Sequence, residues 1–486
     1  MTYAQIVRYI FESEVCMKKK NTKSRNKLIP FFTNTLLILF HVFLFSLIWY
    51  KKYHPGLLVP YYGKGNYVII LLFAFLLLVF NQVFGGLKLG YYKLLESIVA
   101  RILGLCAAYF FMYFIVSLLS YRMISPLFML FAVVAGVLFT VAWTYLTNYI
   151  YYHIYPPRKM LLIYGDSSID EIYSKISSRS EKYEIVKRMH YKAGEDKLKK
   201  EIRKHEAVIL HDLSASLRNH LMKYCYEHSV RVYVTPKLYD ILIRGADEMN
   251  LFDTPFLLMR NRGLTTFEAF VKRAMDFVIS ITCLIVTLPI MLLIALLLKC
   301  FDKGPVFYRQ TRLTLNGKEF QILKFRSMYP DAEKDAVRLM SKTDERITPI
   351  GKVLRQTHLD ELPQLFNIMK GEMSFVGPRP ERPEIAAIYM TQIPEFSYRL
   401  KMKAGLTGYA QVYGKYNSTP YDKLKLDLMY IQNYSILLDI RLLLLTGKTL
   451  FIPDHTEGIS GEFQTALREE VAVSEEQKKY DKNRLS

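Results

Sequence analysis

The stretch FVISITCLIVTLPIMLLIALLLK (277–299) decides how the chain is organised, because it separates two polar regions and is long enough to cross a membrane. If it crossed, the regions before and after it would lie on opposite faces of that membrane. The region that follows carries many basic residues, and Lys and Arg close to a span are usually retained on the cytoplasmic side. This charge distribution weighs against an ordinary crossing.

Pro289 offers an alternative arrangement of this stretch. It leaves arms of about 18 Å and 14 Å of helix, each near half of a membrane core of roughly 30 Å. Proline removes a helical hydrogen bond and can kink the axis, so both arms could enter and leave on one face. Side chains such as Thr287 could then satisfy the freed carbonyls. On these residues alone, a re-entrant helix and a kinked ordinary span both stay open.

Four further apolar stretches precede it, each near the roughly 20 residues that cross a bilayer. They cover approximately 31–49, 67–84, 97–120 and 126–150. The basic segment KKKNTKSRNK (18–27) comes first, so the positive-inside rule predicts a cytoplasmic N-terminus. Four crossings would return the chain to the cytoplasm at Arg158.

The composition supports contact with a membrane and with phosphate. The chain has 486 residues, a net charge of +21 and 51% hydrophobic residues. This charge fits an anionic lipid surface, a phosphorylated substrate or nucleic acid, but no nucleic-acid-binding motif accompanies it. The five cysteines show no metal-binding or disulfide-like spacing. Nucleic acid is therefore not an expected partner.

Residues 158–262 have the sequence pattern of a soluble α/β module. Short apolar runs alternate with polar helical stretches, as in a doubly wound parallel sheet; the runs are MLLIYG (160–165), YEIVKRM (183–189), AVILHD (207–212) and RVYVTP (231–236). The first turn, YGDSSID, has one glycine where a dinucleotide-binding fingerprint has three. The module is thus predicted to resemble a Rossmann fold without binding NAD, and a structural or oligomerisation role is expected.

Residues 304–371 combine a predicted hairpin with an acidic pair. In GPVFYRQTRLTLNGKEFQILKFRSM (304–328), two strands of alternating polar and apolar residues flank an Asn-Gly turn. Lys324 and Arg326 lie at the end of this hairpin. GKVLRQTHLDELPQLFNIMKG (351–371) predicts two helices, the second starting near Thr357, which places Asp360 and Glu361 at a helix N-terminus. Adjacent helical residues point about 100° apart, which suits different roles for the two acids. Helix capping is the commoner explanation for such a pair.

The segment SFVGPRPER (374–382) predicts a Gly- and Pro-rich turn with Arg379 at its apex. A guanidinium on a preorganised backbone can hold a diphosphate, although such a turn can also be merely rigid. The nearby charges favour a phosphate site. The candidate binding residues are Lys324, Arg326, Arg355, Gly377, Pro378, Arg379 and Pro380. Farther on, residues 421–451 mix apolar runs with charges and predict a helix lying at the membrane surface.

Three motifs together resemble the bacterial sugar transferase family of monotopic polyprenyl-phosphate phosphoglycosyl transferases. They are KFRSM (324–328), LRQTHLDELPQLFNIMKGEMSFVGPRP (354–380) and KAGLTGYAQVYG (403–414). The resemblance covers 267 to about 452, and the preceding spans and α/β module resemble the long form of the family. It implies transfer of a hexose-1-phosphate, glucose or galactose phosphate, from a UDP-sugar to undecaprenyl phosphate with release of UMP. This reaction starts exopolysaccharide, capsule or O-antigen synthesis.

By the same resemblance, Asp360 is the nucleophile, Glu361 completes the catalytic pair, and a re-entrant helix hinged at Pro289 enters one leaflet of the bilayer. Two positions depart from the family pattern. Leu288 stands where many members have Ser, so the hydroxyl at the kink must come from elsewhere, such as Thr287. His358 also stands where many have Ser, which removes a capping hydroxyl near Glu361.

The expected chemistry needs neutralisation of charge, because carboxylates repel a nucleotide diphosphate. A Mg²⁺ ion held partly by Asp360 or Glu361, together with the basic residues, would supply it. Gly408, Gln411 and Tyr413 are expected contacts for the uridine or the sugar. Two other functions stay open: an inactive membrane scaffold or sensor of polysaccharide assembly, and a transporter built on the four spans.

The expected fold is a membrane protein with a four-helix transmembrane bundle, a degenerate Rossmann-like α/β module, and an α+β phosphoglycosyl transferase domain with a re-entrant helix. The expected location is the bacterial cytoplasmic membrane, with the catalytic domain facing the cytoplasm, and a homo-oligomer is one expectation. The expected divisions are a cytoplasmic tail (1–27), four transmembrane helices (28–151), the α/β module (158–262), the re-entrant helix (265–300), the catalytic domain (301–455) and a polar tail (456–486).

Overall fold

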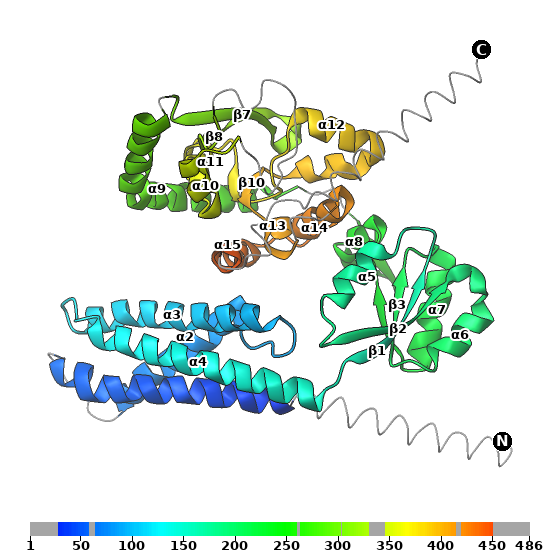
Figure 1. The fold of residues 1–486 in the computed structure, drawn as a ribbon, viewed down its shortest axis with the longest axis horizontal. Helices are drawn as coiled ribbons and strands as arrows, with labels where there is room; N and C mark the ends of the chain where they lie inside the picture. Colours follow the sequence, from blue (N-terminus) through cyan, green and yellow to red (C-terminus); the bar gives the residue numbers. More distant parts are fainter. Residues whose placement is uncertain are drawn as a thin grey trace. The chain divides into compact units, whose positions relative to one another are not determined.

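The computed structural model describes residues 28–57, 64–259, 263–302, 304–329, 346–414 and 419–450. The expected tails at 1–27 and 456–486, including the basic segment 18–27, lie outside the described residues. The chain divides into two compact units, Met1–Pro236 and Lys237–Ser486. Each unit is described by itself (Figure 1).

The first unit begins with four apolar helices that are long enough to cross a membrane. They are Leu28–Gly56, α2 (Lys64–Phe84), α3 (Leu94–Leu119) and α4 (Leu127–Ile154). The first ends in a π-helical turn, η1 (Trp49–Tyr53), and a 3-10 turn, η2 (His54–Gly56). One hydrophobic core containing Phe45, Phe73 and Met112 joins them. Together with a fifth apolar helix in the second unit, these helices fit a membrane protein.

Two ionisable groups buried in these helices, Arg101 and His41, bond within the protein. Arg101 is buried and donates hydrogen bonds to Gly86 O, Thr144 Oγ1 and Asn34 Oδ1. His41 Nε2 lies 3.0 Å from Thr140 Oγ1. Arg101 and His41 therefore tie helices together, as buried polar side chains in membrane helices commonly do.

A four-stranded sheet completes the first unit. The strands β1 (Arg158–Tyr164), β2 (Tyr183–His190), β3 (Ala207–His211) and β4 (Arg231–Val234) are all parallel, in the order β2-β1-β3-β4. The four predicted strands are confirmed. The connecting helices are α5 (Asp170–Ser177), η3 (Tyr191–Ala193), α6 (Glu195–Ile202) and α7 (Ala215–Glu227).

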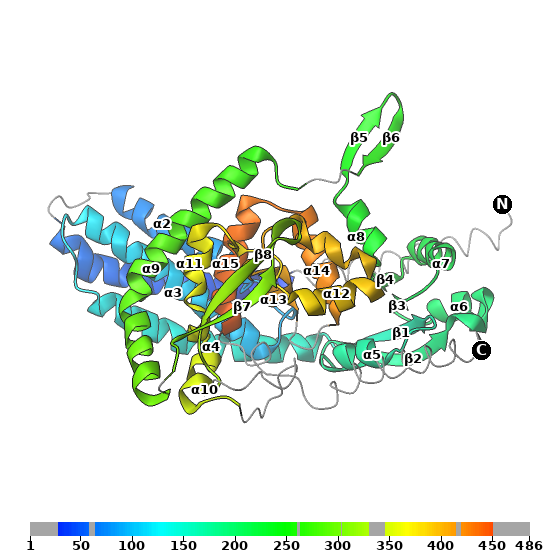
Figure 2. The same cartoon turned by 90° about the horizontal axis from the view of Figure 1, so that it is seen from above.

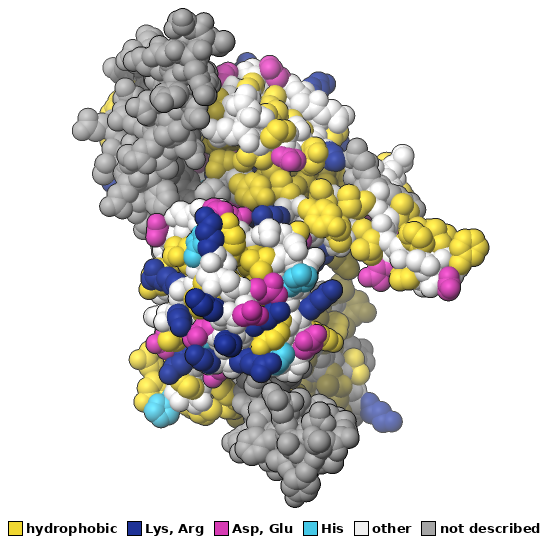
Figure 3. All heavy atoms as spheres, turned by 90° about the vertical axis from the view of Figure 1, so that its right-hand side faces the viewer, with side chains coloured by type: hydrophobic (Ala, Val, Ile, Leu, Met, Phe, Trp, Pro, Cys, Tyr) yellow, Lys and Arg dark blue, Asp and Glu magenta, His cyan; other side chains and the backbone are white. Residues whose placement is uncertain are grey.

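Alternating residues of β1 fill two cores, one on each face of the sheet. Leu161 and Ile163 pack with residues of α6 and α7, whereas Met160 and Leu162 pack with residues of α5. The sheet is thus covered on both faces, as parallel sheets usually are (Figure 1). The outer surface of this part carries interspersed basic and acidic side chains (Figure 3).

The last strand of the sheet ends at Val234, so the described residues 237–259 of the expected module form other elements. They are α8 (Leu238–Arg244) and an antiparallel hairpin of β5 (Asp247–Leu251) and β6 (Thr254–Leu258). Among the strands of the described residues, the two of this hairpin pair only with each other, and the hairpin projects from α8 (Figure 2). Phe252 at its tip is fully exposed.

Helix α9 (Thr266–Asp302) is continuous through Pro289 and changes direction along its length (Figures 1 and 2). Proline at 289 cannot donate to the carbonyl four residues earlier, which belongs to Ile285. The Thr287 hydroxyl, which we expected to meet a freed carbonyl, donates to Cys283 O at 2.7 Å. It therefore reinforces the turn before the proline and leaves Ile285 O to other partners.

The remaining elements form an α+β part. The antiparallel hairpin joins β7 (Phe307–Leu313) and β8 (Glu319–Phe325) through η4 (Leu315–Gly317), and β9 (Ser374–Val376) pairs in parallel with β10 (Gly405–Thr407). The predicted Asn-Gly turn is confirmed, with positive φ at Asn316 and Gly317. The helices are α10 (Pro349–Gln356), η5 (Leu359–Glu361), α11 (Gln364–Lys370), α12 (Pro383–Gln392), η6 (Pro394–Lys401), α13 (Tyr409–Tyr413), α14 (Pro420–Gln432) and α15 (Ile436–Leu450).

Two local predictions differ from the structure. The second helix of 351–371 begins at Gln364 rather than near Thr357, because His358 adopts a left-handed backbone (φ 56°) that ends the helical run after α10. The predicted surface helix at 421–451 is two helices. Its charged Asp439 and Lys448 are buried in the protein instead of facing the membrane surface.

Candidate functional site

The acidic pair lies in the 3-10 turn η5, between α10 and α11. The flanking Leu359 and Leu362 pack in a core that includes Met291 and Ile294 of α9. The pair is thus attached directly to the apolar helix through its neighbours. Its carboxylates do not cap α11, whose N-cap receives no side-chain hydrogen bond. Helix capping therefore does not explain these acids.

Glu361 is held by two cations from distant parts of the chain. Its Oε1 accepts from Lys324 Nζ of β8 at 2.7 Å and from Arg379 Nη2 at 3.1 Å. Burial raises the pKa of Glu361, but the two cations together lower it by more than burial raises it. The pKa of Glu361 therefore lies well below the usual range. This side chain is a fixed anion at neutral pH.

Asp360 is in a different state. It is only 8% exposed, and within the described part of the chain no donor lies within hydrogen-bond distance of its carboxylate. Burial raises the pKa of Asp360, and the nearby Lys324 partly offsets this effect. A buried carboxylate normally has partners, so an unpartnered one is available for a substrate or a metal ion. The two adjacent acids therefore have different surroundings, and these surroundings suit different roles.

The two other predicted basic residues, Arg355 and Arg326, have different surroundings. Arg355 Nε donates to Ser327 Oγ at 2.7 Å, and its charge acts on Asp360. Arg326 is buried against Gly304, where an added Cβ would lie 1.7 Å from its Nη1. Arg355 thus lies near the nucleophile candidate, whereas Arg326 fills the interior beside the start of β7.

The Gly-Pro-Arg-Pro turn is held by hydrogen bonds to its backbone at every residue. Gly377 N donates to Thr407 O, and Gly405 N donates to Pro378 O, both at 2.9 Å. Arg399 Nη2 donates to Arg379 O at 2.9 Å, and Arg312 Nη1 donates to Pro380 O at 3.1 Å. This leaves the Arg379 side chain 52% exposed while its backbone is fixed. Such a preorganised cation suits anion binding.

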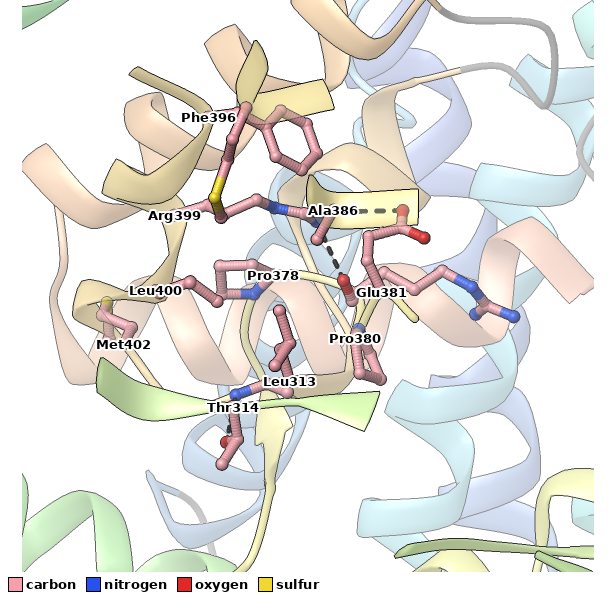
Figure 4. Close-up of a pocket in the computed structure, with 13 residues that line it drawn as sticks. Leu313, Thr314, Pro378, Pro380, Glu381, Ala386, Phe396, Arg399, Leu400 and Met402 are labelled. Atoms are coloured by element: carbon pink, nitrogen blue, oxygen red, sulfur yellow. Dashed lines mark hydrogen bonds and ion pairs between the residues drawn. The ribbon is translucent and has the colours of Figure 1, made fainter. Parts of the chain in front are cut away.

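Sequence reasoning missed Arg399, which is buried among charged groups. It contacts Asp427 Oδ2 at 2.8 Å and Glu381 Oε1 at 3.5 Å. Figure 4 shows its side chain reaching towards Glu381 beside Pro378 and Pro380. The cavity lined by these residues measures about 10 Å³, near the limit for one water molecule, so it holds no substrate. No local pattern marks Arg399, because its partners are distant in the sequence.

The residues expected to contact uridine or sugar lie beside this turn. Gly408 approaches the turn so closely that an added Cβ would lie 2.1 Å from Gly377 O. Both side-chain amide atoms of Gln411 are buried and have no hydrogen-bond partner among the described residues. Tyr413 is exposed, and its ring packs 4.5 Å from that of Tyr409. Gln411 therefore has unused hydrogen-bonding capacity, whereas Gly408 serves the backbone packing.

The acidic pair by itself offers a divalent cation only two carboxylates. Among the described residues no cluster of three or more His, Cys, Asp or Glu side chains could hold a metal. Enzymes often hold Mg²⁺ with one or two carboxylates and the phosphates of the substrate. The unpartnered Asp360 carboxylate meets this requirement, and Glu361 could add Oε2, since its Oε1 is already engaged.

These features define the class of protein. Apolar helices long enough for a membrane accompany a compact polar site in which one carboxylate is free and the other is clamped by cations. A fixed arginine at the same site supplies the means to hold phosphate. The chain thus combines apolar helices that fit a membrane protein with a charged site suited to an anion such as phosphate.

Comparison with known proteins gives the family. The model of the family described as bacterial sugar transferase matches residues 267–453. A UDP-glucose:undecaprenyl-phosphate glucose-1-phosphate transferase of Caulobacter vibrioides is 38% identical, over 38% of this chain and 71% of the relative. The chain belongs to the bacterial sugar transferase family, as the three sequence motifs predicted.

Two other relatives align over less of their length. An undecaprenyl-phosphate glucose phosphotransferase of Komagataeibacter xylinus is 38% identical, over 45% of this chain and 42% of the relative. A UDP-N-acetylgalactosamine-undecaprenyl-phosphate N-acetylgalactosaminephosphotransferase of Aeromonas hydrophila is 37% identical, over 37% and 44% respectively. The match thus spans less than half the length of these two relatives.

Proposed function

We propose that this chain transfers a hexose-1-phosphate from a UDP-sugar to undecaprenyl phosphate and releases UMP, through a covalent intermediate on Asp360. The relatives are named for transferring glucose phosphate or N-acetylgalactosamine phosphate to this acceptor, which supports the reaction class. The observation that carries the proposal is the contrast between the two acids. Asp360 is buried without a partner, and Glu361 is clamped by Lys324 and Arg379.

In the first step, a carboxylate oxygen of Asp360 attacks the β-phosphorus of the UDP-sugar. The bond from this phosphorus to the bridging oxygen breaks, and UMP leaves with that oxygen. The result is an acyl phosphate of Asp360 that carries the sugar, as in other covalent catalysis by carboxylates. The cations Lys324, Arg355 and Arg379 offset the negative charge that otherwise keeps a carboxylate from a diphosphate.

In the second step, a phosphate oxygen of undecaprenyl phosphate attacks the same phosphorus. The bond to Asp360 breaks, which restores the carboxylate and forms a lipid diphosphate that carries the sugar. This acceptor cannot leave the bilayer, so the site must adjoin a membrane helix. The packing of Leu359 and Leu362 with Met291 of α9 is consistent with this requirement.

Mg²⁺, when bound, would supply Lewis-acid neutralisation of the diphosphate. The free Asp360 carboxylate and Glu361 Oε2 are the protein atoms that would hold it. Glu361 has a further function of its own: it fixes the ammonium of Lys324 and the guanidinium of Arg379 at one point. Gln411 would supply its unused amide to the uridine or the sugar.

We also propose that α9 enters and leaves one face of the bacterial cytoplasmic membrane, with the catalytic part on the cytoplasmic side. The bend of α9 and the proline within it support this arrangement (Figure 1). Cysteines placed after Lys299 should react only with reagents on the cytoplasmic side. Labelling of these cysteines from outside the cell would contradict the re-entrant arrangement.

The reaction is tested by UMP release from purified full-length protein with Mg²⁺, undecaprenyl phosphate and a panel of UDP-sugars. Asp360→Asn should lower kcat at least about 1000-fold, since an amide does not form the intermediate. The matched control is Asp422→Asn, an acid on α14 bonded to Lys425. Equal UMP release by wild type and Asp360→Asn would refute the nucleophile assignment. The panel would also identify the preferred hexose.

A trapping experiment checks the intermediate directly. With a UDP-sugar labelled in the sugar and no lipid acceptor, label should attach covalently to the protein at Asp360 and be lost when the acceptor is added. Normal turnover without any labelled protein would exclude a covalent route.

A further inference from the structure

A second hollow lies in the same unit, lined by residues of α8, α13, α14 and α15. Its volume is about 390 Å³, comparable to the liquid volume of roughly a dozen water molecules. The lining residues are Arg244, Tyr409, Met429, Asn433, Ser435, Leu437, Leu438 and Arg441. It contains none of the residues that the proposed reaction uses.

Two arginines face this hollow without a counter-charge. Among the described residues, neither Arg244 nor Arg441 has a carboxylate within ion-pair distance, and Arg441 Nε is buried with no hydrogen-bond partner. The lining contains no acid. A buried guanidinium nitrogen without an acceptor is costly, so the hollow is suited to an anion that both arginines can bind.

The acid nearest in sequence to Arg441 points away from the hollow. Asp439 of α15 is fully buried and bonds to Lys272 Nζ at 2.5 Å and to Tyr430 OH at 2.7 Å. Residues two apart on a helix face nearly opposite directions, which is why Asp439 and Arg441 serve different sides of α15. The positive charge of Arg441 is thus not neutralised from within its own helix.

The surface beside Arg441 is apolar and exposed. Leu437, one helical turn before Arg441, is 78% exposed, and Ile440, three residues after Leu437, is 42% exposed. The opposite side of the helix is joined to α9, the apolar helix long enough for a membrane, through Lys272. An anion that brings a hydrocarbon chain would use both surfaces at once.

We propose that this hollow binds the phosphate headgroup of an anionic lipid, with Arg244 and Arg441 on the phosphate and Leu437 and Ile440 along the first part of the lipid chain. The site links α8 to α15 and is separate from the carboxylate pair. A lipid phosphate is favoured over free phosphate because free phosphate would leave the exposed leucine and isoleucine in water.

Binding to the purified full-length protein tests this site without reference to turnover. Calorimetric titration in detergent would use dihexanoyl phosphatidic acid, dihexanoyl phosphatidylcholine and inorganic phosphate. We expect the phosphatidic acid to bind most tightly of the three. The variant Arg244→Gln/Arg441→Gln should weaken its binding at least about tenfold, because two charged hydrogen-bonding groups are lost.

The matched control is Arg188→Gln/Arg309→Gln, which removes the same charge from exposed positions outside the hollow and should bind as wild type. If the first double variant does not fold, Arg244→Gln alone, at an exposed helix end, should still weaken binding about threefold. Unchanged affinity in the arginine variants would overturn the site. Inorganic phosphate binding as tightly as the lipid would overturn the assignment to a lipid.

Discussion

Lys324 Nζ lies 2.7 Å from Glu361 Oε1, and this salt bridge joins strand β8 to the turn that carries both acids. Its charge also acts on the neighbouring Asp360, whose pKa burial raises and Lys324 partly lowers. One ammonium therefore fixes one carboxylate and favours the ionised form of the other.

Lys324→Met should lower kcat/KM by about 100-fold, as expected when one preorganised cation is removed from a reacting anion. The pH profile should also change. Asp360 attacks only as a carboxylate, so kcat/KM falls as the pH drops through its pKa, and losing Lys324 moves that pKa upwards. The acid limb should therefore shift to higher pH, whereas Lys352→Met, at an exposed position of α10, should leave it in place. An acid limb that stays fixed or moves down would contradict this role.

Gln411→Ala should raise the KM for the UDP-sugar by about tenfold with little change in kcat. Both amide atoms of Gln411 are buried without partners among the described residues, so the substrate is their expected partner. Loss of one or two hydrogen bonds made equally in the ground and transition states has this effect. Gln392→Ala, at the exposed end of α12, is the control. A fall in kcat at constant KM would instead place Gln411 in the chemical step.

Lys272 and Asp439 form a buried pair between α9 and α15. Lys272→Met or Asp439→Leu alone should each lower the free energy of unfolding by about 3–5 kcal/mol, since the remaining charge is buried unpaired. The double variant should recover much of this loss. Unfolding followed in one detergent across the four proteins of the cycle measures the coupling, and additive losses would show that the two side chains act independently.

His358 precedes the acidic pair with a left-handed backbone, φ 56°. His358→Val should therefore reduce stability by about 1–2 kcal/mol, whereas His358→Gly should cost less, because glycine adopts positive φ freely. Gln356→Val, at an exposed helical position two residues earlier, controls for the β-branched side chain. Thermal unfolding gives the comparison, and equal losses for valine and glycine at 358 would argue that the imidazole itself matters.

The sequence by itself determined the local elements and the family. Apolar length predicted the five candidate membrane helices, β-branched runs predicted the four parallel strands, and Asn316-Gly317 predicted the hairpin turn. These features depend on neighbouring residues, so a linear pattern carries them. The three quoted motifs likewise identified the region matched by the family model.

Only the tertiary structure decided how the charged residues pair. Glu361, rather than Asp360, receives Lys324 and Arg379, and the buried Arg399 holds the backbone of the Arg379 turn. Two charges of the predicted surface helix, Asp439 and Lys448, turned inward, and Asp439 meets Lys272 of a helix far away in the chain. Pairing at this range depends on how β8, α9, α15 and the turns pack together. No periodic pattern in the sequence records that packing.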